Sequence, residues 1–216
     1  PMDQNLRQRL AQAGLEHHAH ILSEDPWVVV VEHYLPLAER TALVRAAASC
    51  LQAPLLDTGD IEADTTVRSG RVAWIHHDHA PGIRALADRI ALIVGMPLLN
   101  AESFQVVRYG PGQEYRPHFD GYDMDTRVGE ANAARGGQRL VTALLYLSAP
   151  AIGGATGFPT LDIDVPAMPG RLLVFWNVGD DSRKPHPGSL HAGNPVEVGE
   201  KWIANLWFRE RRYEGG

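Results

Sequence analysis

Three residues of this chain have the types and spacing of a metal site. His118 and Asp120 form a His-x-Asp pair within the segment EYRPHFD, and His191 follows later in GSLHAG, where a loop meets an expected strand. Side chains two positions apart on a strand point to the same face, so both can reach one ion. Two imidazoles and a carboxylate occupy one face of an octahedral transition metal and leave three positions open for reacting ligands. Taken alone, the three residues favour the plainer interpretation of one surface histidine and one structural histidine in the core.

A second His-x-Asp pair, formed by His76 and Asp78 in WIHHDHAPG, lies just before an expected helix. Composition alone produces such pairs by chance in a chain with ten histidines. An aspartate just before a helix is typical of a helix N-terminus, where it interacts with free backbone N–H groups. We therefore interpret this second pair as a solvent-exposed loop rather than a metal site.

The N-terminal half of the chain favours helices. Apolar residues at helical spacing predict helices over 37–52 and 81–95, the second with Pro81 near its start and Gly95 near its end. Residues 27–31 (WVVVV) are typical of a buried strand, and 54–80 have the character of a loop. Residues 3–25 carry a short amphipathic pattern, compatible with a helix that caps the fold or with a loose arm.

From Phe104 onward the apolar pattern becomes strand-like. The expected strands are 104–109, 114–120, 139–147, 171–176 and 201–208, each bounded by glycine or proline. Helices followed by strands predict an α+β fold with the helices on one face of an antiparallel sheet or barrel. The long connections 121–137 and 177–190 are expected to be functional lids. We expect a single domain over 1–216, with helical support over about 1–100 and a barrel core over about 101–212.

The composition argues against several classes of protein. The chain has 216 residues, with 20 Lys and Arg against 26 Asp and Glu, and a formal net charge of −6. This acidic balance and the lack of basic runs disfavour nucleic-acid binding. One cysteine excludes an internal disulfide framework and a multi-cysteine zinc site. No apolar run approaches the roughly 20 residues that span a bilayer, and the polar N-terminus does not resemble a signal peptide, so a cytoplasmic location without membrane association is expected.

Five segments follow one another in a recognisable order: FQVVRYGPGQEYRPHFD, GGQRLVTALLYL, GGATGFP, PGRLLVFWN and SLHAGNPVEVGEKWIANLWFRE. Together they cover about half of the chain and resemble the 2-oxoglutarate- and Fe(II)-dependent dioxygenases of the prolyl 4-hydroxylase-like branch. A weaker similarity extends upstream to DPWVVVVEHYLPLAE and VRSG. The resemblance implies a double-stranded β-helix, or jelly roll, with the metal at its mouth. It also implies Fe(II), 2-oxoglutarate and O2 as reactants, with ascorbate as a reductant.

The resemblance carries specific roles onto this sequence. His118, Asp120 and His191 match the iron ligands, and Lys201 matches the basic residue that pairs with the distal carboxylate of 2-oxoglutarate. A buried dianion needs such a cation and hydrogen-bond donors. Tyr109 and Tyr146 match hydrogen-bond donors to the cosubstrate. Asn205 and Trp207 match residues that line the cosubstrate pocket, with Trp207 on the substrate side, and Thr156 in GGATGFP also fits the family pattern. Arg68 and Arg139 are interpreted as substrate-orienting residues. Each residue also has a purely structural interpretation. The tyrosines could be amphipathic barrel residues and Trp207 a core residue. Lys201 could lie on an exposed strand edge, and the arginines could be surface charges.

The chain departs from the family pattern in two places. Ala155 stands where a charged residue commonly precedes the threonine, and the loop before His191 is long and polar. His186 in that loop is a rival ligand, disfavoured because the SLHAG context surrounds His191 and not His186.

The implied reaction is hydroxylation of an unactivated C–H bond with release of succinate and CO2. A prolyl residue in a peptide or protein is the leading expected substrate, with a free amino acid or another small metabolite as the alternative. A nucleic-acid demethylase and a non-catalytic metal-binding barrel are less favoured.

Overall fold

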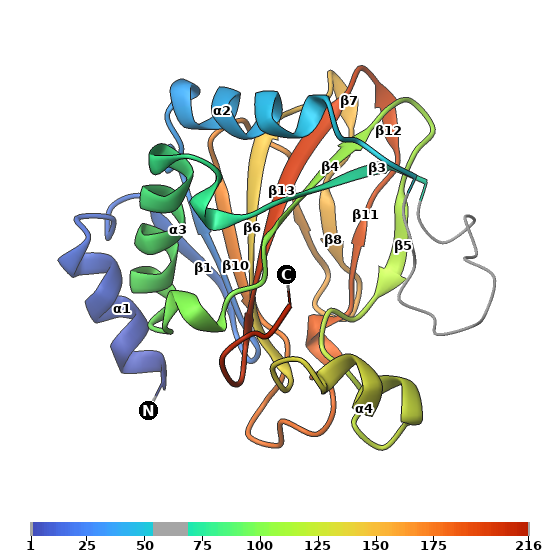
Figure 1. Ribbon diagram of the computed structural model, residues 1–216. Coiled ribbons are helices and arrows are strands. Elements are labelled where there is room, and N and C mark those ends of the chain that lie inside the picture. Colours follow the sequence, from blue (N-terminus) through green and yellow to red (C-terminus); the bar gives the residue numbers. More distant parts are fainter. Residues whose placement is uncertain (1, 54–68, 216) are drawn as a thin grey trace.

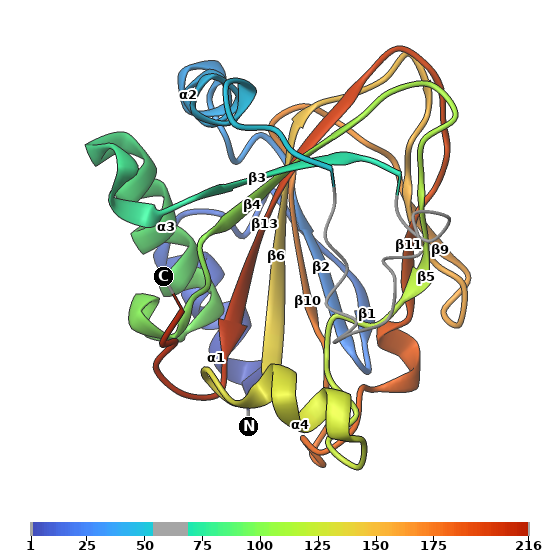
Figure 2. The same cartoon turned by 45° about the vertical axis from the view of Figure 1, so that its right-hand side comes forward.

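A large antiparallel sheet forms the centre of the molecule, with helices on its outer face and a smaller sheet opposite its inner face (Figures 1 and 2). The computed structural model describes residues 2–53 and 69–215, with side chains from residue 5 onward. The large sheet has seven strands in the spatial order β1 (Ala19–Glu24), β2 (Trp27–Val31), β10 (Leu172–Trp176), β6 (Arg139–Ser148), β13 (Lys201–Arg209), β4 (Phe104–Tyr109) and β3 (Arg71–Ile75). The smaller sheet has the order β5 (Tyr115–His118), β11 (His191–Gly193), β8 (Thr156–Phe158) and β9 (Ile163–Val165). A two-stranded ribbon pairs β12 (Val196–Val198) with β7 (Ile152–Gly153).

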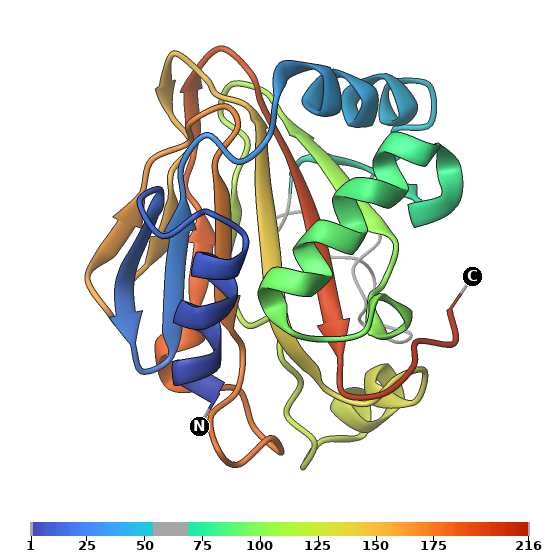
Figure 3. The same ribbon diagram turned by 90° about the vertical axis from the view of Figure 1, so that its left-hand side faces the viewer.

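Three helices cover the outer face of the large sheet (Figure 3). They are α1 (Met2–Gln12), α2 (Leu37–Ala48) and α3 (Pro81–Val94). Gly95 ends α3 in the left-handed conformation at φ 75°, which glycine adopts without steric cost. A fourth helix, α4 (Arg127–Ala133), lies at one end of the barrel in the connection between the two sheets (Figure 1). Short 3₁₀ turns are η1 (His77–His79), η2 (Leu98–Asn100) and η3 (Pro187–Ser189).

The alternation of side chains along the strands builds two separate hydrophobic cores. Along β2, Val29 and Val31 pack in the core beneath the helices, whereas Val28 and Val30 pack between the two sheets. The same alternation sends Ala204, Leu206 and Phe208 of β13 toward the helices. The alternate positions of β13 are Lys201, Ile203, Asn205, Trp207 and Arg209, and by the period of two they face the barrel interior. The polar residues of β13 therefore enter the barrel because of the strand period.

The expected fold class is confirmed as α+β with helices on one face of a jelly roll, but several elements differ from expectation. The predicted helices and the strand at 27–31 are present, and residues 2–12 form a helix that buries Leu6 and Leu10. The elements that were not predicted include β1, the edge strand β3 within the expected 54–80 loop, α4 within the expected 121–137 loop, and the short strands β7, β8, β9 and β12. Short polar strands such as β1, whose side chains alternate between half-buried and exposed, carry a weak apolar signal.

The expected strand over 114–120 ends earlier than the sequence indicated. β5 stops at His118, and Asp120 lies beyond it in a bend. The chain turns inward there, because the Asp120 carboxylate accepts hydrogen bonds from Thr142 and Trp207 of the large sheet.

Among residues 2–53 and 69–215, no helix has the length and apolar character needed to span a membrane.

Candidate metal centre and cosubstrate pocket

His118, Asp120 and His191 come together although only two of them lie on strands. His118 on β5 and His191 on β11 are directly opposite each other in the small sheet, with ring centroids 4.3 Å apart. Asp120 lies between them, with Oδ1 3.6 Å from His118 Nε2 and Oδ2 3.6 Å from His191 Nε2. One ligand atom from each of the three side chains lies within 4.8 Å of the others. The spacing is that of donors converging on one position.

Backbone carbonyls fix the orientation of both imidazoles. Nδ1 of His118 lies 2.8 Å from the Arg116 carbonyl oxygen, and Nδ1 of His191 lies 3.0 Å from that of Ser189. A carbonyl only accepts, so each Nδ1 carries the proton and each Nε2 presents its lone pair. Burial lowers the pKa of His191 to about 4, which keeps this ring neutral at physiological pH. Neutral imidazole is the form that binds a metal.

The Asp120 carboxylate is held by two donors on the large sheet. Thr142 Oγ1 donates to Oδ2 at 2.7 Å, and the Trp207 indole N–H donates to the same oxygen at 2.8 Å. Burial by itself raises the pKa of Asp120, but the neighbouring His191 and His118 outweigh it and hold the pKa well below its usual range. Asp120 is therefore ionised, and its Oδ1, which accepts neither bond, is the oxygen left to bind a metal.

Lys201 is a buried cation inside the barrel without a counter-ion among the described residues. Its side chain is only 2% exposed, and burial lowers the pKa of its ammonium to about 7. Its Nζ lies 5.8 Å from the Tyr109 ring centroid and 5.6 Å from that of Tyr146. Burial is the one cause that shifts this pKa, with no contribution from a neighbouring carboxylate among the described residues. An unpaired buried ammonium is costly, so the site suits an anionic ligand.

The residues present therefore fit both expected groups. The three converging donors match the ligand set of a two-histidine, one-carboxylate Fe(II) site. Tyr146 lies beside the lysine, fully buried, and its hydroxyl donates to Thr156 Oγ1 at 2.7 Å. A carboxylate near Lys201 would gain a charge-assisted interaction that the protein itself does not provide.

The remaining predicted site residues, Asn205, Arg139 and Arg68, differ in their surroundings. Asn205 donates weakly to Gln105 at 3.4 Å. Arg139 is not a surface charge: its side chain is 14% exposed and forms an ion pair with Glu102. Its role as a substrate contact stays a prediction. Arg68 lies outside the described residues.

The two alternative candidates from the sequence, His186 and the His76–Asp78 pair, have other partners. His186 Nδ1 accepts from the Gly188 N–H at 3.0 Å, and its Nε2 lies 3.2 Å from Asp25, so His186 is no ligand here. Asp78 forms an ion pair with Arg84 at 2.8 Å on the surface, in agreement with the loop interpretation.

Sequence reasoning missed Thr142, Glu102 and Arg209. Thr142 shares an inward strand face with Tyr146, four residues later on β6, and this period was a usable signal. Glu102 is a buried carboxylate that contacts Arg139 and Arg209. Its position before a strand offered no signal, because the partners are distant in sequence.

The comparisons with known proteins agree with this geometry. Residues 104–209 match the family model of the 2OG-Fe(II) oxygenase superfamily. A putative prolyl 4-hydroxylase of Acanthamoeba polyphaga mimivirus is 41% identical over 69% of this chain and 62% of its own length. Prolyl 4-hydroxylase 1 of Arabidopsis thaliana is 34% identical over 88% of this chain and 71% of its own length. The human prolyl 4-hydroxylase subunit alpha-3 is 31% identical, but the chain spans only 35% of that relative.

Solved structures show the same similarity. The viral collagen prolyl hydroxylase of Paramecium Bursaria Chlorella virus-1, in its 2OG complex, has a TM-score of 0.63 and 33% identity, and the match covers 84% of this chain and 95% of that one. A Trichoplax adhaerens prolyl hydroxylase has a TM-score of 0.64 at 16% identity, which shows the fold alone. The resemblance noted in the sequence is confirmed: the chain belongs to the 2OG-Fe(II) oxygenase superfamily, in its prolyl 4-hydroxylase-like branch.

Proposed function

We propose that this protein is an Fe(II)- and 2-oxoglutarate-dependent hydroxylase that acts on prolyl residues in a peptide or protein. The observation that carries the proposal is the pairing, in one barrel, of three converging metal donors with a buried lysine that lacks a counter-ion among the described residues. A structural metal site has no need of such a lysine. The relatives named prolyl hydroxylases support the prolyl substrate.

In this proposal His118, Asp120 and His191 hold the iron. When bound, iron and 2-oxoglutarate supply the activation of O2, so that one oxygen atom enters a substrate C–H bond and 2-oxoglutarate leaves as succinate and CO2. Lys201 holds the distal carboxylate of 2-oxoglutarate, with the Tyr109 and Tyr146 hydroxyl groups beside it. The apolar barrel core around these side chains excludes water from the reacting groups.

The half-exposed Trp74 marks the substrate side of the site. Its indole is 52% exposed and lies 6.0 Å from the buried Trp207 ring, centroid to centroid. Flat apolar surface next to the metal donors suits a pyrrolidine ring better than a free amino acid with two charged groups. This favours the peptidyl substrate over a small zwitterion.

The test is an anaerobic titration of metal-free protein with Fe(II) and then 2-oxoglutarate. We expect the visible charge-transfer band of a chelated keto acid. Lys201→Met should retain iron but need about 100-fold more 2-oxoglutarate for the same band, since it loses a buried charge pair. Succinate release should then rise with a proline-containing peptide and not with free proline. A wild-type protein that holds iron but gives no band would contradict the assignment of the cosubstrate pocket.

A further inference from the structure

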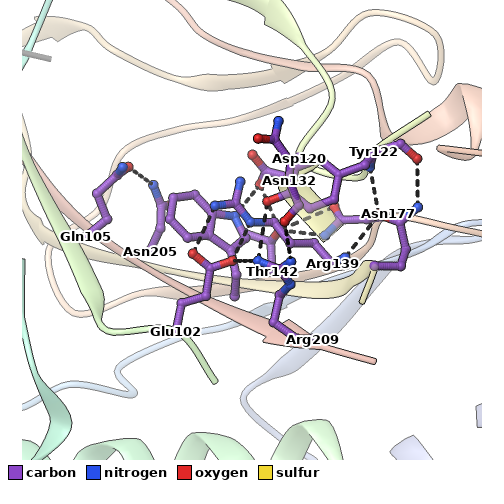
Figure 4. A network of polar contacts seen from close by, with 12 residues as sticks. Glu102, Gln105, Asp120, Tyr122, Asn132, Arg139, Thr142, Asn177, Asn205 and Arg209 are labelled. Atoms are coloured by element: carbon purple, nitrogen blue, oxygen red, sulfur yellow. Dashed lines mark hydrogen bonds and ion pairs between the residues drawn. The ribbon is translucent and has the colours of Figure 1, made fainter. Parts of the chain in front are cut away.

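A buried cluster of three charged residues lies beside the metal donors, and the proposed reaction uses neither Glu102 nor Arg209 (Figure 4). Arg139 approaches the Glu102 carboxylate with two donors, at 2.6 and 2.9 Å. Arg209 adds a third at 2.8 Å. Glu102 and Arg209 are each only 2% exposed. We refer to Glu102, Arg139 and Arg209 as the charge cluster.

Arg209 joins this cluster to the connection 121–137. Its guanidinium donates to the carbonyl oxygen of Asn132 at 2.7 Å and to that of Gly137 at 2.9 and 2.7 Å. It also reaches the Tyr122 hydroxyl at 3.4 Å. The Asn132 carbonyl lies in the last turn of α4, where the helix itself offers no donor. One side chain of β13 therefore fixes both ends of this connection to the barrel.

The guanidinium of Arg209 has no donor to spare. A guanidinium carries five N–H groups. In Arg209, Nε donates to Gly137, Nη1 faces Glu102 and Tyr122, and Nη2 faces Asn132 and Gly137. Every N–H thus has an acceptor within the protein. A substrate contact by Arg209 would break one of these bonds, so its role lies in positioning other groups.

The other arm of the cluster reaches the metal carboxylate. The Arg139 guanidinium, held by Glu102, lies 3.9 Å from the centroid of the Trp207 ring and 5.2 Å from that of Tyr122. A guanidinium packed on an indole face restrains the ring through cation–π attraction and contact. The restrained indole donates its N–H to Asp120 Oδ2 at 2.8 Å. A continuous path of contacts thus runs from α4 through the charge cluster to Asp120.

We propose that Arg209 is a positioning residue that anchors the connection 121–137 and, through Glu102 and Arg139, holds the Trp207 indole in the orientation that fixes Asp120 for metal binding. This inference rests on the proposed function, because it requires a metal between the three donors. Its consequence is that the order of the 121–137 segment and the metal affinity depend on the same side chain.

The test uses Arg209→Met in the full-length chain, with two measurements. Removing Arg209 leaves Glu102 and Arg139 as a charge-balanced pair, so the fold is expected to survive. Trypsin should then cleave the metal-free variant at the exposed Arg127 and Arg135 about tenfold faster than the wild type, because the connection has lost its anchors. The dissociation constant of Co(II), followed through its visible d–d bands, should rise about tenfold, with an altered band shape.

Two further variants make the result specific. Arg209→Lys keeps the cation against Glu102 but has one donor group instead of a fork, so it should restore part of both effects. It also serves if Arg209→Met does not fold. Arg89→Met removes another bidentate arginine, which pairs with Glu39 between α2 and α3 at 2.9 and 2.7 Å, and should change neither measurement.

The outcomes separate the two proposals. Wild-type protein that fails to bind Co(II) would overturn the proposed function and this inference with it. Wild-type binding of Co(II), together with an Arg209→Met variant whose cobalt constant and spectrum match the wild type, would overturn the role of Arg209 alone. Trypsin cleavage of the connection 121–137 that is no faster in Arg209→Met than in the wild type would likewise overturn the role of Arg209.

Discussion

The two buried charges of the site, Asp120 and Lys201, are treated in opposite ways by the surrounding protein. Asp120 accepts two hydrogen bonds from the large sheet and lies between two imidazoles. The Lys201 ammonium lies over the rings of Tyr109 and Tyr146, and its pKa falls to about 7 through burial. The protein therefore stabilises the charged form of the carboxylate and destabilises that of the lysine.

The difference indicates two kinds of preparation for a ligand. At the metal end, the donors are fixed in protonation state and direction before any ion binds, which lowers the cost of binding. At the lysine end, the buried ammonium destabilises the ligand-free protein, and an anionic ligand would compensate its charge. A substitution at the first end should reduce ligand binding through lost order, and one at the second should also change the stability of the ligand-free protein.

The largest expected effect comes from Asp120→Asn. The amide keeps the shape of the carboxylate but removes the only negative charge among the three donors. We expect the Co(II) dissociation constant to rise by at least about 100-fold and succinate release to vanish. Equilibrium cobalt titration and succinate quantification measure the two effects.

Asp78→Asn is the matched control for this substitution. It lies in the other His-x-Asp pair of the chain, on the surface and paired with Arg84. Its cobalt affinity and succinate release should equal those of the wild type. If Asp120→Asn bound cobalt as tightly as this control, the assignment of Asp120 as a metal donor would be wrong.

The next effect is a pH dependence of stability that comes from Lys201. The folded-state pKa of about 7 lies below the unfolded value of 10.5, so between these values the unfolded chain binds more protons than the folded one. The burial cost is therefore fully present below pH 7 and disappears as the pH rises toward 10.5. Between pH 7 and pH 9 this should raise the free energy of unfolding by about 2 kcal/mol.

Urea unfolding of metal-free wild-type protein and of Lys201→Met at both pH values isolates this contribution. The difference in the free energy of unfolding between variant and wild type should be largest at pH 7, where the variant is the more stable protein, and should shrink at pH 9. A difference that does not change with pH would show that the Lys201 ammonium is not destabilised by burial.

The fold could be predicted well where the apolar period was strong. The long helix α3 and the strands β4, β6 and β13 were expected almost at their observed bounds, because each carries continuous apolar spacing. The edge strand β3 and the helix α4 were missed, because short elements held mainly by tertiary contacts carry a weak local signal.

The candidate site divides in the same way. His118, Asp120, His191 and Lys201 could be proposed from the sequence because they lie in short, recognisable sequence patterns. Their supporting groups were not predicted. The hydrogen bond from Thr142 to Asp120 joins the large sheet to the bend after β5, and Arg209 contacts Glu102 across 107 positions of the sequence. Side-chain partners this far apart in sequence are set by packing, and packing is not visible in one sequence.

The smallest expected effect compares two buried threonines, one at each end of the site. Thr142→Val removes one of the two donors to Asp120 and should weaken Co(II) binding about tenfold while leaving 2-oxoglutarate binding to the iron-loaded protein nearly unchanged. Thr156→Val removes the nearer acceptor of the Tyr146 hydroxyl and should weaken 2-oxoglutarate binding by a few-fold without changing the cobalt constant, as measured by the same two titrations. If the metal site and the lysine site are independent, Thr142→Val should weaken mainly cobalt binding and Thr156→Val mainly 2-oxoglutarate binding. Equal losses of both from either variant would therefore mean that the two sites act as one unit.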